Sequence, residues 1–76
     1  MQELIGCIAR SLVDKPDEVK VNLIEEDDSV TIELTVAPED LGKVIGKQGR
    51  TARAMRSLLS ASAARFDKRS RLEIIE

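Results

Sequence analysis

The chain has 76 residues, of which 42% are hydrophobic and 34% charged, and its formal net charge is −2. This length predicts one domain, residues 1–76, with a small core, and the hydrophobic content argues against a disordered chain. No apolar run reaches the length of a membrane span, and Glu3 stands where a signal peptide would need positive charge. The single cysteine, Cys7, excludes an internal disulfide, so we expect a cytoplasmic protein.

Helical and strand periodicities alternate in the first half of the chain. Apolar residues recur at helical spacing from Leu4 to Val13, and Pro16 ends this pattern. Residues 19–23 and 30–36 alternate as two strands around the acidic turn 25–29. This turn lacks the glycine and the ligand spacing of a calcium loop, so we interpret it as a solvated hairpin. Cys7 lies among the apolar positions of the first helix, which predicts a buried structural thiol.

The second half predicts two helices and a last strand. Pro38 suits the first turn of a short helix that extends to about Ile45. A long helix follows from about Arg50 to Phe66, and residues 71–75 form a strand. Five residues of the long helix share the face expected to pack on the sheet: Ala52, Met55, Leu59, Ala63 and Phe66. The order α-β-β-α-α-β predicts an α+β fold, a three-stranded mixed sheet covered on one face by three helices.

Charge is distributed very unevenly along these elements. Residues 1–42 contain three basic and eleven acidic side chains, whereas residues 43–71 contain nine basic side chains and one acidic. A solvated helix face would explain two or three of these cations. A basic block of this density favours a polyanionic partner.

Gly46-Lys47-Gln48-Gly49 lies near the start of the basic block, between the two predicted helices. Glycine adopts positive φ and lets the backbone approach a partner closely, while Lys47 and Gln48 offer a cation and an amide. Arg50 then begins a helix whose first N–H groups lack internal partners, which suits a phosphate. The alternative interpretation is a tight helix–helix turn with solvated charges.

Other uses of these glycines and other chemistries fit poorly. A P-loop needs four residues between its glycines and Ser or Thr after the lysine, but Gln48 follows Lys47. A dinucleotide-binding fold needs a longer chain. For catalysis, the chain has no histidine and its one thiol is expected in the core, so we predict no catalytic residue. We also expect no metal, no cofactor and no small-molecule substrate.

The predicted order of elements, together with the motif from Val44 to Arg50 and the arginines that follow, resembles a type II KH domain. The chain is similar to the KhpA family, short stand-alone bacterial KH proteins that bind RNA, over nearly its whole length. The resemblance implies non-catalytic binding of single-stranded RNA with weak sequence preference, by a post-transcriptional regulator or RNA chaperone. The RNA-binding residues it implies are Val44, Ile45, Gly46, Lys47, Gln48, Gly49, Arg50, Arg53 and, in a variable loop at 67–70, Lys68 and Arg69.

The groove implied by this resemblance holds about four single-stranded nucleotides. Its expected floor is aliphatic: Val44, Ile45, Ala52 and Leu34. Ala52 stands where KH domains usually carry a larger aliphatic residue, a departure that bears on base selectivity. Because Phe66 is the one aromatic residue and is expected in the core, bases are not held by aromatic stacking, worth roughly 1–3 kcal/mol each elsewhere. We therefore expect weak, salt-sensitive binding.

A strip of the long helix opposite its core face suggests a second function. It consists of Ala54, Leu58, Ala61 and Arg65. The strip is either a set of helix-forming surface residues or a smooth dimer interface. Members of the similar family pair with themselves and with a larger KH-containing protein, which implies a homodimer or a heterodimer. The alternative function is therefore a protein-interaction subunit in which RNA binding is secondary.

Overall fold

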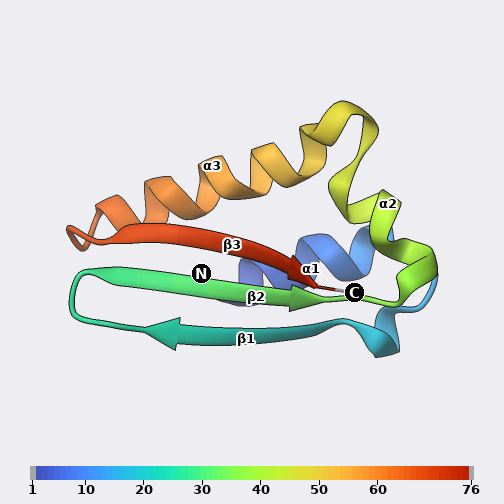
Figure 1. Cartoon of the computed structure of the whole chain (residues 1–76), viewed down its shortest axis with the longest axis horizontal. Coiled ribbons are helices and arrows are strands. Elements are labelled where there is room, and N and C mark those ends of the chain that lie inside the picture. The colour runs from blue at the N-terminus through green and yellow to red at the C-terminus, as the bar shows by residue number, and fades with distance from the viewer. Residues whose placement is uncertain (1, 76) are drawn as a thin grey trace.

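The computed structural model describes residues 2–75 and has the predicted α-β-β-α-α-β order (Figure 1). Its helices and strands, in chain order, are α1 (Gln2–Leu12), β1 (Lys20–Glu25), β2 (Ser29–Thr35), α2 (Leu41–Ile45), α3 (Arg50–Ala64) and β3 (Arg69–Ile75). Three single turns of 3₁₀ helix connect them: η1 (Pro16–Glu18), η2 (Pro38–Asp40) and η3 (Lys47–Gly49). Each predicted element is present, with its ends displaced by at most three residues.

The sheet is mixed, as predicted. Its strand order is β1-β2-β3, with β1 antiparallel and β3 parallel to the central strand β2. The three helices lie on one face, with α3 extended along β3, and the other face is uncovered (Figure 1). The chain therefore forms two layers, a fold of the type II KH arrangement.

The core lies between these layers and follows the alternation of β2. Val30, Ile32 and Leu34 are fully buried, whereas Thr31 and Glu33 on the other face remain partly exposed. From the helices, the core receives the buried side chains Ile5, Ala9, Val44, Met55 and Leu59. This packing fixes the start of α3, and with it the position of the glycine loop.

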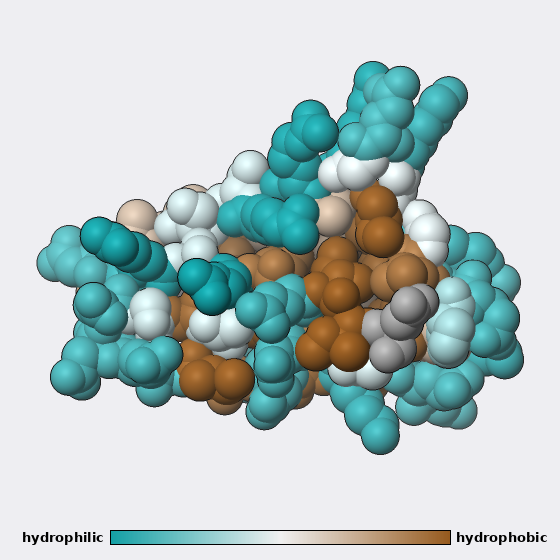
Figure 2. All heavy atoms as spheres, viewed as in Figure 1, coloured by the Kyte–Doolittle hydropathy of each residue, from teal (hydrophilic) through white to brown (hydrophobic). Residues whose placement is uncertain are grey.

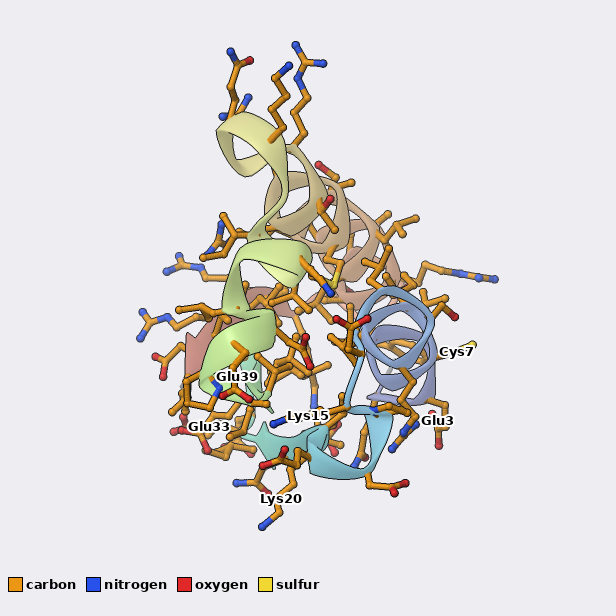
Figure 3. The ribbon with its side chains drawn as sticks, turned by 90° about the vertical axis from the view of Figure 1, so that its right-hand side faces the viewer. Glu3, Cys7, Lys15, Lys20, Glu33 and Glu39 are labelled. Atoms are coloured by element: carbon orange, nitrogen blue, oxygen red, sulfur yellow. The ribbon has the colours of Figure 1, made fainter. Side chains whose placement is uncertain are left out.

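Two predictions about side chains were wrong. Phe66 is 67% exposed, because α3 ends at Ala64 and the chain turns away at Asp67, where φ is +56°. Cys7 is exposed and points away from the ribbon (Figure 3), because α1 buries only a stripe that consists of Ile5, Gly6 and Ala9. The apolar arc of this helix is wider than the stripe that the sheet covers, so Leu4 and Leu12 also stay about 40% exposed.

A buried carboxylate, that of Asp40, links the segment that follows α1 to the start of α2. Asp40 is 1% exposed, and its oxygens accept hydrogen bonds from the backbone N–H groups of Asp14 (3.3 Å) and Lys15 (3.0 Å). Lys43 Nζ lies 3.8 Å from the same carboxylate and also contacts Asp14. These bonds attach the connection after α1 to the start of α2 and satisfy a group that would be costly to bury alone.

Candidate nucleic-acid interface

The glycine loop has an unusual backbone. Gly46 (φ +79°, ψ 171°), Gln48 (φ +58°) and Gly49 (φ +74°) all have positive φ. Gly46 N–H donates to Gly42 O and Gly49 N–H to Gly46 O, so the turn is closed at both ends. Within residues 2–75, no backbone carbonyl accepts the N–H of Lys47 or Gln48. These two donors are exposed at the tip, in a conformation of the kind that cradles anions.

Position 46 requires glycine for two reasons: its dihedral angles, and the lack of space for a side chain. A Cβ at this position would lie 2.3 Å from Thr51 Oγ1 and 2.9 Å from the backbone N of Thr51. A Cβ at Gly49 would meet nothing within 4 Å. The first glycine therefore lets the loop pack on the beginning of α3, whereas the second serves mainly its left-handed φ.

Cations surround the tip of this loop. Arg50 donates a hydrogen bond to Gln48 Oε1 (3.3 Å), and Arg53 donates to the Gln48 carbonyl oxygen (3.4 Å). Lys47, Arg50 and Arg53 are exposed and form no ion pair with any carboxylate of the described chain. Long polar side chains project from the loop in Figure 3. The loop thus brings together three positive charges and two N–H donors that are unpaired within residues 2–75.

The predicted aliphatic floor is only partly accessible. Val44, Ala52 and Leu34 are at most 3% exposed and belong to the core, while Ile45 is 36% exposed. Sequence analysis missed Ile75, which is 39% exposed at the end of β3, where its carbonyl oxygen accepts a hydrogen bond from Val36 N–H. Alternation with the buried Leu72 was the signal that placed Ile75 on the other face. Apolar surface gathers below the glycine loop in Figure 2.

The other basic segment is arranged differently. Lys68 Nζ lies 2.8 Å from Glu25 Oε2, and the Lys68 side chain is only 19% exposed. This hydrogen bond lowers the pKa of Glu25 below its ordinary value. Arg69 belongs to β3 and not to the loop, since its N–H donates to Asp28 O at 2.9 Å. Both predicted variable-loop residues therefore help to hold the β1–β2 hairpin.

Cations outside the glycine loop also have partners near α2. Lys43 is bonded to Asp14, which raises the pKa of Lys43 above its ordinary value. Lys15 is bonded to Glu39, and that bond raises the pKa of Lys15 and lowers that of Glu39 (Figure 3). The nine basic residues of the second half are therefore not nine free charges.

The proposed interaction strip lies outside this interface. Ala54, Leu58, Ala61 and Arg65 are all exposed, and Leu58 is 46% exposed.

No helix of residues 2–75 is long and apolar enough to cross a membrane. The same residues contain no group of three or more His, Cys, Asp or Glu side chains that could hold a metal ion.

Comparison with known proteins assigns the family. The sequence profile described as KhpA/KhpB, KH domain, matches residues 2–74. The chain belongs to this KhpA/KhpB family of KH domains. No solved structure matches it significantly.

Relatives in the family have similar lengths. The protein named RNA-binding protein KhpA from Caldanaerobacter subterraneus is 57% identical over 75 residues, which cover 99% of this chain and all of the relative. The protein of the same name from Clostridium acetobutylicum is 53% identical with the same coverage. That from Borreliella burgdorferi is 54% identical over 97% of this chain and 90% of its own length.

Proposed function

We propose that this protein binds single-stranded RNA in the cytoplasm, without catalysis, through the Gly46–Gly49 loop and the apolar surface below it. The observation that carries the proposal is the loop itself. Two backbone N–H groups and three cations, none with a backbone carbonyl or carboxylate partner among residues 2–75, converge on one exposed turn. The names of the relatives support RNA as the polyanion.

Affinity and selectivity follow from the same surface. Phosphates meet charges and N–H groups that carry no sequence information, while bases meet aliphatic side chains such as Ile45 and Ile75. Phe66 lies at the far end of α3 from the glycine loop, so no aromatic residue stacks on a base there. Binding is weakly selective, and the protein acts as a post-transcriptional regulator or an RNA chaperone.

A second candidate function is protein interaction through the strip Ala54, Leu58, Ala61 and Arg65. Leu58 is a large apolar side chain, 46% exposed and flanked by small residues at one-turn spacing, which favours close helix–helix approach. The family description names KhpA and KhpB together, which supports a second KH-containing protein, the larger one that the resemblance implies, as the partner. A second copy of this chain is the other candidate.

One pair of variants separates the two functions. Lys47→Asp with Gln48→Asp places two negative charges where a phosphate would lie, on exposed residues, so we expect RNA affinity to fall by about tenfold or more with little change in Tm. Leu58→Glu is expected to convert a dimer into a monomer. Anisotropy with labelled RNA and sedimentation measure the two effects.

The outcomes of this experiment are distinct. Unchanged RNA affinity in the folded double variant would contradict the loop as the binding site. A wild-type protein that sediments as a monomer at tens of micromolar would leave the strip as ordinary surface, or as a site for a different chain.

A further inference from the structure

A second group of unpaired cations lies on the uncovered face of the sheet. Arg69 and Arg71 are two residues apart on β3, so their side chains emerge on the same face. That face is the uncovered one, because Leu72, which points the other way, is buried beneath the helices. Neither arginine forms an ion pair with a carboxylate among residues 2–75.

These arginines lie beside hydroxyl groups and line a hollow. In the parallel register, Ser29 is opposite Arg69 and Thr31 is opposite Arg71. The hollow has a volume of about 350 Å³ and is bounded at the hairpin by Glu26 and Asp28. Two guanidinium groups with adjacent hydroxyls are suited to a phosphodiester, since guanidinium donates paired hydrogen bonds to phosphate oxygens.

The arginines continue the positive surface that begins at the glycine loop. Arg53 and Arg56 are exposed and lie one turn apart on α3. At 3.6 residues per turn, Leu58 lies on the opposite flank of the helix, and the flank with Arg53 and Arg56 adjoins the face that packs on the sheet. Figure 2 shows hydrophilic side chains gathered over this flank of α3 and over β3 below it.

Carboxylates restrict the route by which a polyanion reaches these arginines. Next along the uncovered face, Glu33 and Glu73 lie opposite one another, and Glu33 accepts a hydrogen bond from Asn22 at 3.0 Å. Two adjacent carboxylates repel a phosphate chain. A strand bound at the glycine loop therefore reaches Arg71 along α3 and over the free edge of β3, and does not cross the middle of the sheet.

We propose that Arg69 and Arg71, with the hydroxyls of Ser29 and Thr31, bind backbone phosphates of an RNA strand longer than the glycine-loop groove holds. The site extends the groove around the edge of β3 onto the uncovered face of the sheet. It rests on the proposed RNA-binding function. Because Glu26 and Asp28 reduce the local positive potential, its contribution is moderate.

The test compares two RNA lengths. Wild type, Arg71→Gln, and Arg69→Gln with Arg71→Gln are titrated with oligouridines of about four nucleotides, the length of a KH groove, and about twelve. We expect the double variant to lose about three- to tenfold in affinity for the longer RNA, and its salt slope to fall by about 1.4, the value for two lost contacts to a single strand. Affinity for the shorter RNA stays unchanged.

Lys20→Gln is the matched control for Arg71→Gln. Lys20 is exposed on β1 and points away from the ribbon (Figure 3), and its loss removes the same charge without touching β3. An equal loss for both RNA lengths, or no loss for the longer RNA, would overturn the extended site. Failure of the wild type to bind either RNA would instead overturn the proposed function.

Discussion

The two basic segments at the ends of α3 contain similar residues but differ in what their charges contact. At the glycine loop, Lys47, Arg50 and Arg53 have no carboxylate partner in the part of the chain that the structure describes, and the backbone is held in conformations that favour glycine. At the other end, Lys68 is paired with Glu25 and mostly buried. The first segment presents its charge to solvent, and the second uses its charge to hold the hairpin.

This difference shows that a count of basic residues overstates a binding surface. The glycine loop projects beyond the sheet (Figure 1), and its cations form no ion pair with a carboxylate among residues 2–75. The segment at 65–68 lies against the hairpin, which carries Glu25, Glu26, Asp27 and Asp28. Whether a cation is free depends on which distant element the fold places beside it.

The largest expected effect comes from the backbone of the glycine loop. Gly46→Ala should lower the free energy of unfolding by about 2–3 kcal/mol, because φ +79° with ψ 171° belongs almost only to glycine and the added Cβ clashes with Thr51. RNA affinity should fall with it. Chemical denaturation and RNA titration measure both.

Gly49→Ala is the matched control for this backbone effect. Its added Cβ meets no atom, so only the left-handed φ is penalised, at about 1 kcal/mol. Equal destabilisation by the two alanine variants would show that Thr51 moves freely, and that the loop is less constrained than its geometry indicates.

The next largest effect is expected from neutralising one lysine in each basic segment, and RNA affinity should respond differently in the two segments. Lys47→Gln removes a free charge, so RNA affinity should fall about three- to fivefold, and the salt slope by about 0.7. Lys68→Gln removes a paired charge, so affinity should change by less than about twofold while Tm falls slightly. A larger loss of affinity for Lys68→Gln than for Lys47→Gln would contradict the contrast between them.

The smallest expected effect comes from releasing Lys68. Glu25→Gln removes its partner and should raise RNA affinity by up to about twofold relative to Asp27→Asn, which removes the same charge from the hairpin and leaves the pair intact. Equal affinities of the two variants would mean that free Lys68 does not reach RNA.

The same pair should affect stability with a defined dependence on pH. The pKa of Glu25 is lowered in the folded protein, so its stabilising contribution is present above the ordinary carboxyl pKa of 4.5 and is lost as pH falls through the lower folded value. The Tm difference between wild type and Glu25→Gln should therefore be seen near neutral pH and disappear in acid. Thermal melts across this range measure it.

The elements of this fold were predictable because each is specified locally. The alternation of β2, the proline before α2 and the apolar face of α3 each appear in a few consecutive residues. The predicted burial of Phe66 was wrong because the end of α3 depends on Asp67 adopting positive φ, which the helical period does not signal. The predicted burial of Cys7 was wrong because the sheet beneath α1 determines how wide its buried stripe is.

The sequence predicts the part of the site that the backbone of the glycine loop defines. It does not predict which cations are occupied by ion pairs with distant carboxylates. Two glycines three residues apart identify the loop, and their positive φ values are confirmed. Lys43 with Asp14 and Lys68 with Glu25 are separated by 29 and 43 residues, so no local pattern reveals that these lysines are occupied. The role of the loop in RNA binding stays a prediction.

The buried carboxylate of Asp40 also provides a spectroscopic reporter. It holds two amides, those of Asp14 and Lys15, that lie outside any helix or strand and would otherwise exchange rapidly with solvent. Their hydrogen exchange measures how firmly α2 is held. Because α2 leads directly into Gly46, slow exchange of these amides means that the loop is already in position when RNA arrives, and little entropy is lost in ordering it.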